Sequence, residues 1–164
     1  MERKIDIHNA DGGEKELLIG IWLRRADFLE KAGMPMWEKG QFTVEGLDRK
    51  YGNPEYYIGF VDGQPFGGFL LLDYDVRYWP GKRDSAYYFH KFVVAEEFGG
   101  QGLAKEILNW VKNFAAEKEK SYVRLDFEEK REYLRNLYYG AGFKKAGMVE
   151  TETGDMITLA ECVV

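Results

Sequence analysis

The stretch FVVAEEFGGQGLAKEILNWV, residues 92–111, decides the fold that this sequence predicts. An apolar run ends at Val94, and Gly99, Gly100 and Gly102 follow within four positions. A helical pattern then begins at once, with apolar residues on one stripe through residues 103–116. Such a strand, turn and helix start would bring backbone N–H groups and the positive helix end to one point. The stretch therefore predicts a site for a phosphate group.

Several kinds of structure could use this glycine cluster, and its residues distinguish them. A P-loop needs Gly-Lys-Ser/Thr at the helix start, where Gly102-Leu103-Ala104 stands instead. A Rossmann fingerprint needs a small residue where Lys105 lies, and it usually belongs to an early unit of the chain. The sequence therefore disfavours a Rossmann fingerprint, but less strongly than it disfavours a P-loop. A glycine turn that only tightens the corner between strand and helix stays open as an alternative.

Hydrophobic periodicity on both sides of this stretch predicts the other elements. NADGGE, residues 9–14, reads as a turn, and residues 56–75 read as a hairpin around Asp-Gly-Gln-Pro. We expect strands at residues 4–8, 86–94, 122–127, 143–150 and 157–164, and helices at residues 16–33, 43–52, 103–116 and 130–142. This order predicts an α/β or α+β fold with a mixed sheet, in a single domain spanning residues 1–164.

Composition excludes several classes of function. The net charge is −5 without a Lys/Arg tract, which disfavours nucleic acid as a partner. The chain begins without an apolar signal core and contains no apolar stretch of membrane length, so we expect a cytoplasmic protein with no membrane partner. Cys162 is the single cysteine and reads as a strand residue. We expect no metal, because no His/Cys/Asp cluster has ligand spacing along the sequence.

Three motifs in order resemble the GNAT superfamily of N-acetyltransferases. Gly102-Leu103-Ala104 matches the end of the family's Gln/Arg-x-x-Gly-x-Gly/Ala motif, although Gly99 holds its first position. VRLDF, residues 123–127, is similar to the family's next strand. YYGAGF, residues 138–143, is similar to its Tyr-x-x-x-Gly-Phe ending, and Arg131 stands where the family often has Asn. The resemblance covers about residues 55–150.

The resemblance implies a fold and a co-substrate. The fold would be a mixed, mostly antiparallel sheet with helices on both faces and a splayed pair of parallel strands. The co-substrate would be acetyl-CoA, with its pantetheine arm along the backbone of residues 92–94 and its pyrophosphate at the glycine loop. The residues implied in binding are Phe92, Val93, Val94, Gly99, Gly100, Gln101, Gly102, Leu103, Ala104, Lys105 and Arg131.

The resemblance also makes Tyr138 the general acid that protonates the leaving thiolate. A phenol with a pKa near ~10 keeps its proton at neutral pH. The alternative is that Tyr138 packs under the sheet, because Leu134, Leu137 and Ala141 share its helical side. Tyr139 is the fallback acid.

The general base is open between several residues. By strand alternation His90 shares a face with Phe92 and Val94, and some family members carry a catalytic His at this place. Its ordinary pKa near ~6.5 suits a base, while a structural His fits equally well. Asp126 and Glu128 are alternative bases. His8 is expected to be structural.

An acceptor site is expected after the second strand of the hairpin. Asp73 and Asp75 alternate with Tyr74 and precede Trp79, so this patch could hold a cationic amine. Trp37 lies in a region that covers the acceptor site in the family. A solvated turn with aromatic cover is the alternative.

The resulting hypothesis is an acetyl-CoA-dependent N-acetyltransferase that works through a direct ternary complex. The expected acceptor is a small amine such as a polyamine, aminoglycoside or amino acid, with a peptide amine also open. A non-catalytic acyl-CoA-binding module and a Rossmann-type nucleotide domain are the rivals. Strand edges and aromatic residues in the second half permit a homodimer.

Overall fold

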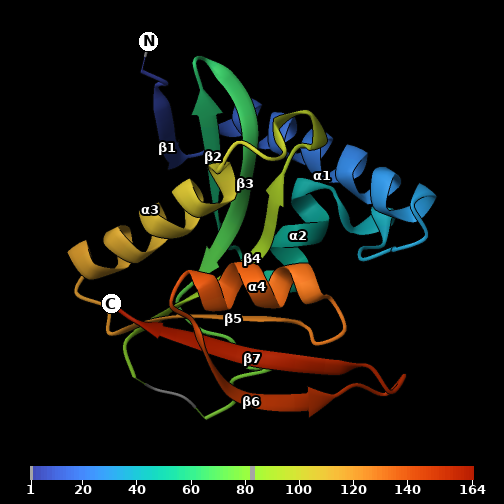
Figure 1. Ribbon diagram of the computed structural model, residues 1–164, viewed down its shortest axis with the longest axis vertical. Coiled ribbons are helices and arrows are strands. Elements are labelled where there is room, and N and C mark those ends of the chain that lie inside the picture. Colours follow the sequence, from blue (N-terminus) through green and yellow to red (C-terminus); the bar gives the residue numbers. More distant parts are fainter. Residues whose placement is uncertain (1, 82–83) are drawn as a thin grey trace. The chain divides into compact units, whose positions relative to one another are not determined.

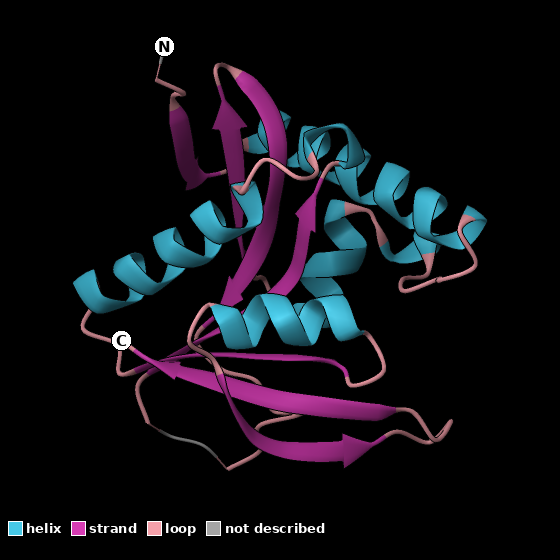
Figure 2. Cartoon of the chain, in the orientation of Figure 1, coloured by secondary structure: helices cyan, strands magenta, loops and turns pink. Residues whose placement is uncertain are grey.

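The computed structural model describes residues 2–81 and 84–164 (Figure 1). Figure 2 distinguishes its helices, strands and loops by colour. The strands are β1 Ile5–Asn9, β2 Glu55–Val61, β3 Gln64–Leu72, β4 Ala86–Val94, β5 Tyr122–Glu128, β6 Lys144–Glu150 and β7 Met156–Val163. The helices are α1 Gly12–Lys31, α2 Val44–Tyr51, α3 Leu103–Glu117 and α4 Glu132–Gly140, with 3₁₀ turns at Lys39–Gln41 and Glu96–Phe98. The predicted order of elements is confirmed.

The strands form a mixed, mostly antiparallel sheet in the order β1-β2-β3-β4-β5-β7-β6. Strands β4 and β5 pair in parallel, at residues 86–88 and 122–124. Strand β5 pairs with β7 along its whole length, from Tyr122 to Glu128. The parallel register thus covers only the first part of each strand in the described chain, which confirms the expected splayed pair.

Residue contacts divide the chain into two compact units. The first contains residues up to Leu71 together with Lys91–Ile107, and the second contains Leu72–His90 together with Leu108–Val164. Strand β4 and helix α3 each contribute residues to both units. In the part of the chain that the structure describes, no helix combines the length and apolar character needed to cross a membrane.

The first unit has its core where α1 and α2 pack on its strands (Figure 1). Trp22 of α1 is fully buried, stacks on Phe42 and meets Tyr56 of β2 edge to face. The apolar stripe of α1 predicted this face, since buried residues at i, i+3 and i+4 fall on one side of a helix. The other buried residues of this core are Ala10, Leu18, Ile19, Ile21, Ala26, Leu47, Ile58, Leu70, Val93 and Ala95.

Helix α1 begins earlier than its sequence pattern predicts. The Asp11 side chain accepts from the backbone N–H of Glu14 at 2.8 Å, and the Glu14 carboxylate accepts from the N–H of Asp11 at 3.2 Å. This capping box starts the helix at Gly12, so the turn expected over residues 9–14 was wrong for Gly12, Gly13 and Glu14.

The hairpin of β2 and β3 is confirmed and turns more tightly than expected. Asp62 and Gly63 have φ values of 48° and 80°, and Gln64 already belongs to β3. Two consecutive residues with positive φ match the right-handed twist of a two-residue hairpin.

In the second unit, α4 lies along β5 (Figure 1), and Phe127 of β5 contacts Tyr138 of α4. The segment between β3 and β4 is fastened at its far end by Arg124 of β5. The Arg124 guanidinium donates to both carboxylate oxygens of Asp84 at 2.7 Å and also to Glu161 at 2.9 Å. A planar guanidinium is suited to such two-point contact with a carboxylate.

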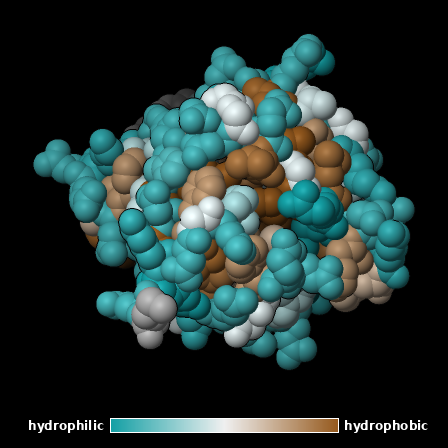
Figure 3. All heavy atoms as spheres, turned by 90° about the horizontal axis from the view of Figure 1, so that it is seen from above, coloured by the Kyte–Doolittle hydropathy of each residue, from teal (hydrophilic) through white to brown (hydrophobic). Residues whose placement is uncertain are grey.

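The space-filling view shows one face, on which hydrophilic side chains surround a smaller apolar area (Figure 3). Exposed apolar side chains are therefore gathered there, and hydrophilic residues cover most of what is seen.

Candidate active site

The glycine cluster forms an exposed turn directly before α3. Gly100 and Gly102 have φ values of 75° and 76°, and nothing lies within 4 Å of the place a Cβ would take at either residue. Leu103 then begins α3, and the first N–H groups of an α-helix have no carbonyl acceptor within the helix. An open backbone at a helix N-terminus is suited to a diphosphate, so this turn fits the anionic end of a CoA molecule.

Arg3 brings a cation to the same turn, which sequence reasoning missed. Its Nη1 donates to the carbonyl of Gln101 at 2.6 Å, and its Nη2 lies 3.9 Å from Glu106 of α3. The two residues of the hydrogen bond are 98 positions apart, so spacing along the chain gave no signal for it. The contact adds positive charge where an anion is expected to bind.

Strand β4 is kinked at Lys91, whose φ is 53°. The Lys91 carbonyl accepts from the indole N–H of Trp22 at 2.7 Å. Beyond the kink Val93 is buried, whereas Phe92 and Val94 are half-buried. The left-handed residue interrupts strand alternation, so alternation alone does not establish which face His90 shares, and its common face with Phe92 and Val94 stays a prediction.

Trp37 lies within the first unit and already faces a cation. The Lys91 ammonium sits 5.6 Å from the centre of the Trp37 ring and 5.9 Å from that of Phe42. Trp37 and Phe42 meet edge to face at 5.7 Å. The aromatic pair is thus of the kind that attracts cationic groups.

His90 lies between two carboxylates of the second unit. Its Nε2 is 2.8 Å from Oδ2 of Asp75, and its Nδ1 is 3.7 Å from Oδ2 of Asp126. The side chains of His90, Asp75 and Asp126 are 11%, 6% and 18% exposed. These residues come from β4, from the segment after β3 and from β5, and the fold brings them together.

Asp75 is held in one orientation by its own chain. Its Oδ1 accepts from the backbone N–H of Arg77 at 2.9 Å and of Tyr78 at 3.3 Å, which leaves Oδ2 for His90. Burial alone would raise the pKa of Asp75. The hydrogen bond and charge of His90, with the two backbone donors, outweigh burial and lower this pKa below its usual value.

Tyr138 is buried beneath aromatic residues of the second unit. Its ring lies 5.2 Å from that of Phe127 and 6.0 Å from that of Phe143, and the residue is 6% exposed. Burial raises the pKa of Tyr138, and the negative charge of Asp126 raises it further. Asp126 therefore acts electrostatically on both Tyr138 and His90.

Arg131 and Glu128 form an ion pair at the start of α4. Nε of Arg131 donates to Oε1 of Glu128 at 2.9 Å, and Arg131 is buried. Lys130 lies 3.4 Å from the other oxygen of Glu128. A CoA molecule that binds Arg131 would therefore have to compete with Glu128 for its guanidinium. Because Glu128 is already paired with cations, it is less suited to act as a base than Asp126.

The residues expected to form an acceptor patch differ in their surroundings. Asp73 is exposed and pairs with Lys120 at 3.0 Å, and Tyr74 is half exposed. Asp75 and Trp79 are buried, and the Arg124 guanidinium lies 5.1 Å from the centre of the Trp79 ring. Asp75 is therefore a hydrogen-bond partner of His90, whereas Trp79 packs against Arg124, which holds the segment between β3 and β4.

Asp75, His90 and Asp126 also offer ligand atoms for a metal ion. One atom from each lies within 4.8 Å of the others, in a search that covered the described residues. Spacing along the sequence could not reveal this group, since it joins residues from three elements.

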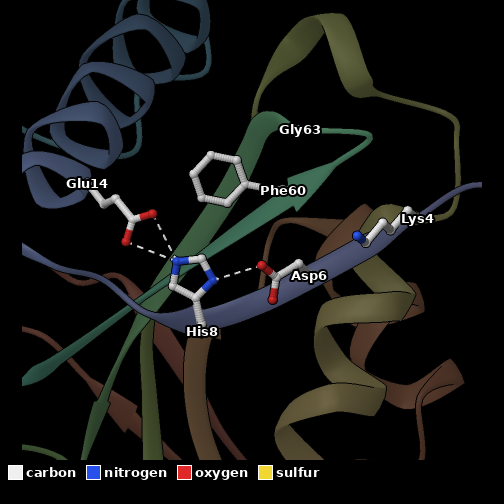
Figure 4. A pocket seen from close by; sticks show the side chains of 6 residues that line it. All are labelled: Lys4, Asp6, His8, Glu14, Phe60 and Gly63. Carbon is white, nitrogen blue, oxygen red and sulfur yellow. Dashed lines mark hydrogen bonds and ion pairs between the residues drawn. The ribbon is translucent and has the colours of Figure 1, made fainter.

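His8 lines a different pocket, entirely within the first unit and about 310 Å³ in volume (Figure 4). Nε2 of His8 lies 2.9 Å from Glu14, and Nδ1 lies 3.1 Å from Asp6. Its ring stacks on Phe60 at 5.5 Å. The polar groups of this pocket thus bind one another, as expected of a structural His.

Comparisons with known proteins agree with the geometry. The model of the acetyltransferase (GNAT) family matches residues 22–143, which is more than half of the chain. An uncharacterized N-acetyltransferase, YesJ of Bacillus subtilis (strain 168), is 24% identical over 142 residues, covering 82% of this chain and 78% of YesJ.

Two solved structures show the same fold. A GNAT-family acetyltransferase from Listeria monocytogenes 4b F2365 has a TM-score of 0.76 at 19% identity, covering 98% of this chain and 95% of the other. The aminoglycoside acetyltransferase AAC(6')-Ib, solved with coenzyme A and kanamycin, has a TM-score of 0.72 at 17% identity, covering 96% and 94%.

Proposed function

Because this chain belongs to the acetyltransferase (GNAT) family, we propose that it transfers the acetyl group of acetyl-CoA to a primary amine of a small molecule. The amine attacks directly in a ternary complex. The alternative acceptor is an amine of a peptide, which would react by the same chemistry.

The exposed glycine turn before α3 carries this proposal. Its backbone donors, the helix N-terminus and Arg3 supply positive potential without a blocking side chain. Phe92, Val93 and Val94 would lie along the pantetheine arm by strand hydrogen bonding. The loop residues from Gly99 to Lys105 would hold the pyrophosphate.

The reaction needs a base, a polarised carbonyl and an acid. His90 takes one proton from the ammonium form of the acceptor. The neutral nitrogen then forms a C–N bond to the acetyl carbon, the C–S bond breaks, and the sulfur leaves with the electron pair. Tyr138 gives its proton to that sulfur, and the proton lost from the new amide nitrogen restores the phenol. The sum is an acetylated amine, CoA thiol and one released proton.

The amine class follows from charge. Asp126 and Asp75 flank His90 in the second unit, and carboxylates attract ammonium groups. The kanamycin bound to AAC(6')-Ib, a structural neighbour, is a small polyamine of this kind. We therefore favour polyamines, aminoglycosides and amino-acid amines as acceptors.

Calorimetric titration with acetyl-CoA, with NADH as the competing cofactor, tests the proposal. Saturable binding of acetyl-CoA alone is expected. Gly100→Ala should weaken it about tenfold or more, because a Cβ would stand between the backbone and the phosphate and φ would be strained. Gly154→Ala is the matched control, with a φ of 84° and open space at an exposed turn. Binding of NADH instead would contradict the proposal.

An amine panel assayed by CoA thiol release then separates an enzyme from a non-catalytic acyl-CoA-binding module. The burial of Tyr138 is the observation that favours the module. Tyr138→Phe should lower kcat about 10²-fold or more while acetyl-CoA affinity stays constant. A turnover rate that Tyr138→Phe leaves unchanged would support the module.

A further inference from the structure

We propose that Asp75 is a positioning residue that fixes the tautomer of His90, so that Nδ1 of His90 is the atom that accepts the proton from the amine. The inference rests on the proposed function and decides which residue is the base. It also gives Asp126 a role, which is to face the imidazolium that forms when His90 takes the proton.

The hydrogen bond between Asp75 and His90 determines where the ring proton lies. A carboxylate can only accept, and Oδ1 of Asp75 already accepts from two backbone N–H groups. Nε2 of His90, at 2.8 Å, must therefore be the donor. In a neutral imidazole with a proton on Nε2, the basic lone pair is on Nδ1.

Asp126 stands beside that basic nitrogen. Its Oδ2 lies 3.7 Å from Nδ1, which is within ion-pair range. When Nδ1 takes a proton, the positive ring lies between two carboxylates that are largely withdrawn from water. The imidazolium then has a carboxylate oxygen near each of its ring nitrogens.

The backbone makes Asp75→Asn a sharp test. The N–H groups of Arg77 and Tyr78 both point at Oδ1 of Asp75, so in the variant the amide oxygen must stay there. The amide NH₂ group then takes the place of Oδ2 and faces His90. It donates to Nε2, which forces the ring proton onto Nδ1 and removes the lone pair that the reaction needs.

A metal ion held by the same three residues makes a different prediction. The 2.8 Å separation of Nε2 and Oδ2 is a hydrogen-bond distance, and an ion bound by both atoms would have to replace the proton between them. A zinc titration of the purified protein distinguishes these cases. Stoichiometric zinc binding that Asp75→Asn abolishes would overturn the proposal.

The experiment combines ¹⁵N NMR of histidine with kinetics. The wild-type spectrum should show His90 as the Nε2–H tautomer, and Asp75→Asn should show Nδ1–H, with His90→Gln identifying the signal. Asp75→Asn should lower kcat by about 10²-fold or more with little change in the KM of acetyl-CoA. The double variant with His90→Gln should be no slower than His90→Gln alone, because both changes remove one function.

The controls distinguish a role of Asp75 in positioning His90 from a merely structural role of Asp75 in the segment after β3. Asp27→Asn, an exposed carboxylate of α1 paired with Lys31, should leave kcat and the His90 spectrum unchanged. Additive losses in the double variant, or an Nδ1–H tautomer in the wild type, would overturn the proposal. Turnover that survives both single variants would remove His90 as the base while the proposed function stands. If the wild type acetylates no amine, the proposed function itself fails, and the spectrum still decides the tautomer.

Discussion

The indole N–H of Trp22 donates to the main-chain carbonyl of Lys91 at 2.7 Å, across 69 positions of sequence. Lys91 has a φ of 53°, the left-handed value that kinks β4. A core residue of α1 thus holds the backbone of β4 at the kink. The Lys91 carbonyl thus accepts the indole N–H of α1 at this point of the strand.

Trp22→Phe should therefore destabilise the protein by about 2–4 kcal/mol, because it opens a cavity and leaves a carbonyl without its donor. Urea unfolding followed by circular dichroism measures this free energy. Trp110→Phe is the matched control, since Trp110 is half-buried and stacks on Phe114. Equal losses for the two variants would show that the hydrogen bond contributes nothing.

Substitutions of Lys91 measure the strain of the kink directly. Lys91→Gly and Lys91→Ala both remove the ammonium from Trp37 and Phe42. Glycine tolerates positive φ and alanine does not, so the glycine variant should be the more stable by about 1 kcal/mol. The difference in urea midpoint between the two variants checks this. A more stable alanine variant would mean that the strand straightens.

Much of the fold was predictable because its signals are local. The bounds of β4, residues 86–94, follow from one apolar run between turn residues, and the Asp62-Gly63 turn follows from its two residues. The start of α1 was missed because the capping box of Asp11 and Glu14 outweighed the helix-breaking tendency of two glycines.

The candidate site was only partly predictable. The glycine turn is contiguous, and sequence reasoning found it. The grouping of Asp75 and Asp126 on His90 joins residues 15 and 36 positions away, and no periodicity reports such contacts. The turn formed by Asp75 with Arg77 and Tyr78 was the one local signal, because aspartate often accepts from N–H groups two and three residues onward.

Arg3→Gln should weaken acetyl-CoA binding about two- to tenfold, because it removes a cation beside Gln101 in the glycine turn. The loss should shrink as salt is added, since exposed charges are screened. Titrations at low and high salt measure both effects. Lys31→Gln, at the far end of α1 and exposed, is the control. A loss independent of salt would indicate a change in structure instead.

Arg124→Met should cost about 2–3 kcal/mol of unfolding free energy, because it removes the charged hydrogen bonds that Arg124 donates to Asp84 and Glu161. The Arg124 side chain is 1% exposed, whereas the side chains of Asp84 and Glu161 are 43% and 27% exposed, so water replaces part of what the two carboxylates lose. Arg49→Met breaks an exposed pair with Glu45 and should cost about 0.5 kcal/mol or less. Urea unfolding of both variants checks the contrast. Similar small losses for the two variants would show that water fully compensates Asp84 and Glu161 for the lost cation.

Stability should fall as pH rises through the titration of His8. The hydrogen bond with Glu14 raises the pKa of His8, the charges of Glu14 and Asp6 add to this, and partial burial opposes it. The folded protein thus binds the His8 proton more tightly than the unfolded chain does. The stabilisation is complete below the unfolded pKa of about 6.5 and disappears as pH passes the higher folded value. Thermal unfolding at about pH 6 and about pH 8 should show a smaller decrease in His8→Gln than in the wild type. Identical decreases would mean that the Glu14 contact is lost to solvent in the protonated state.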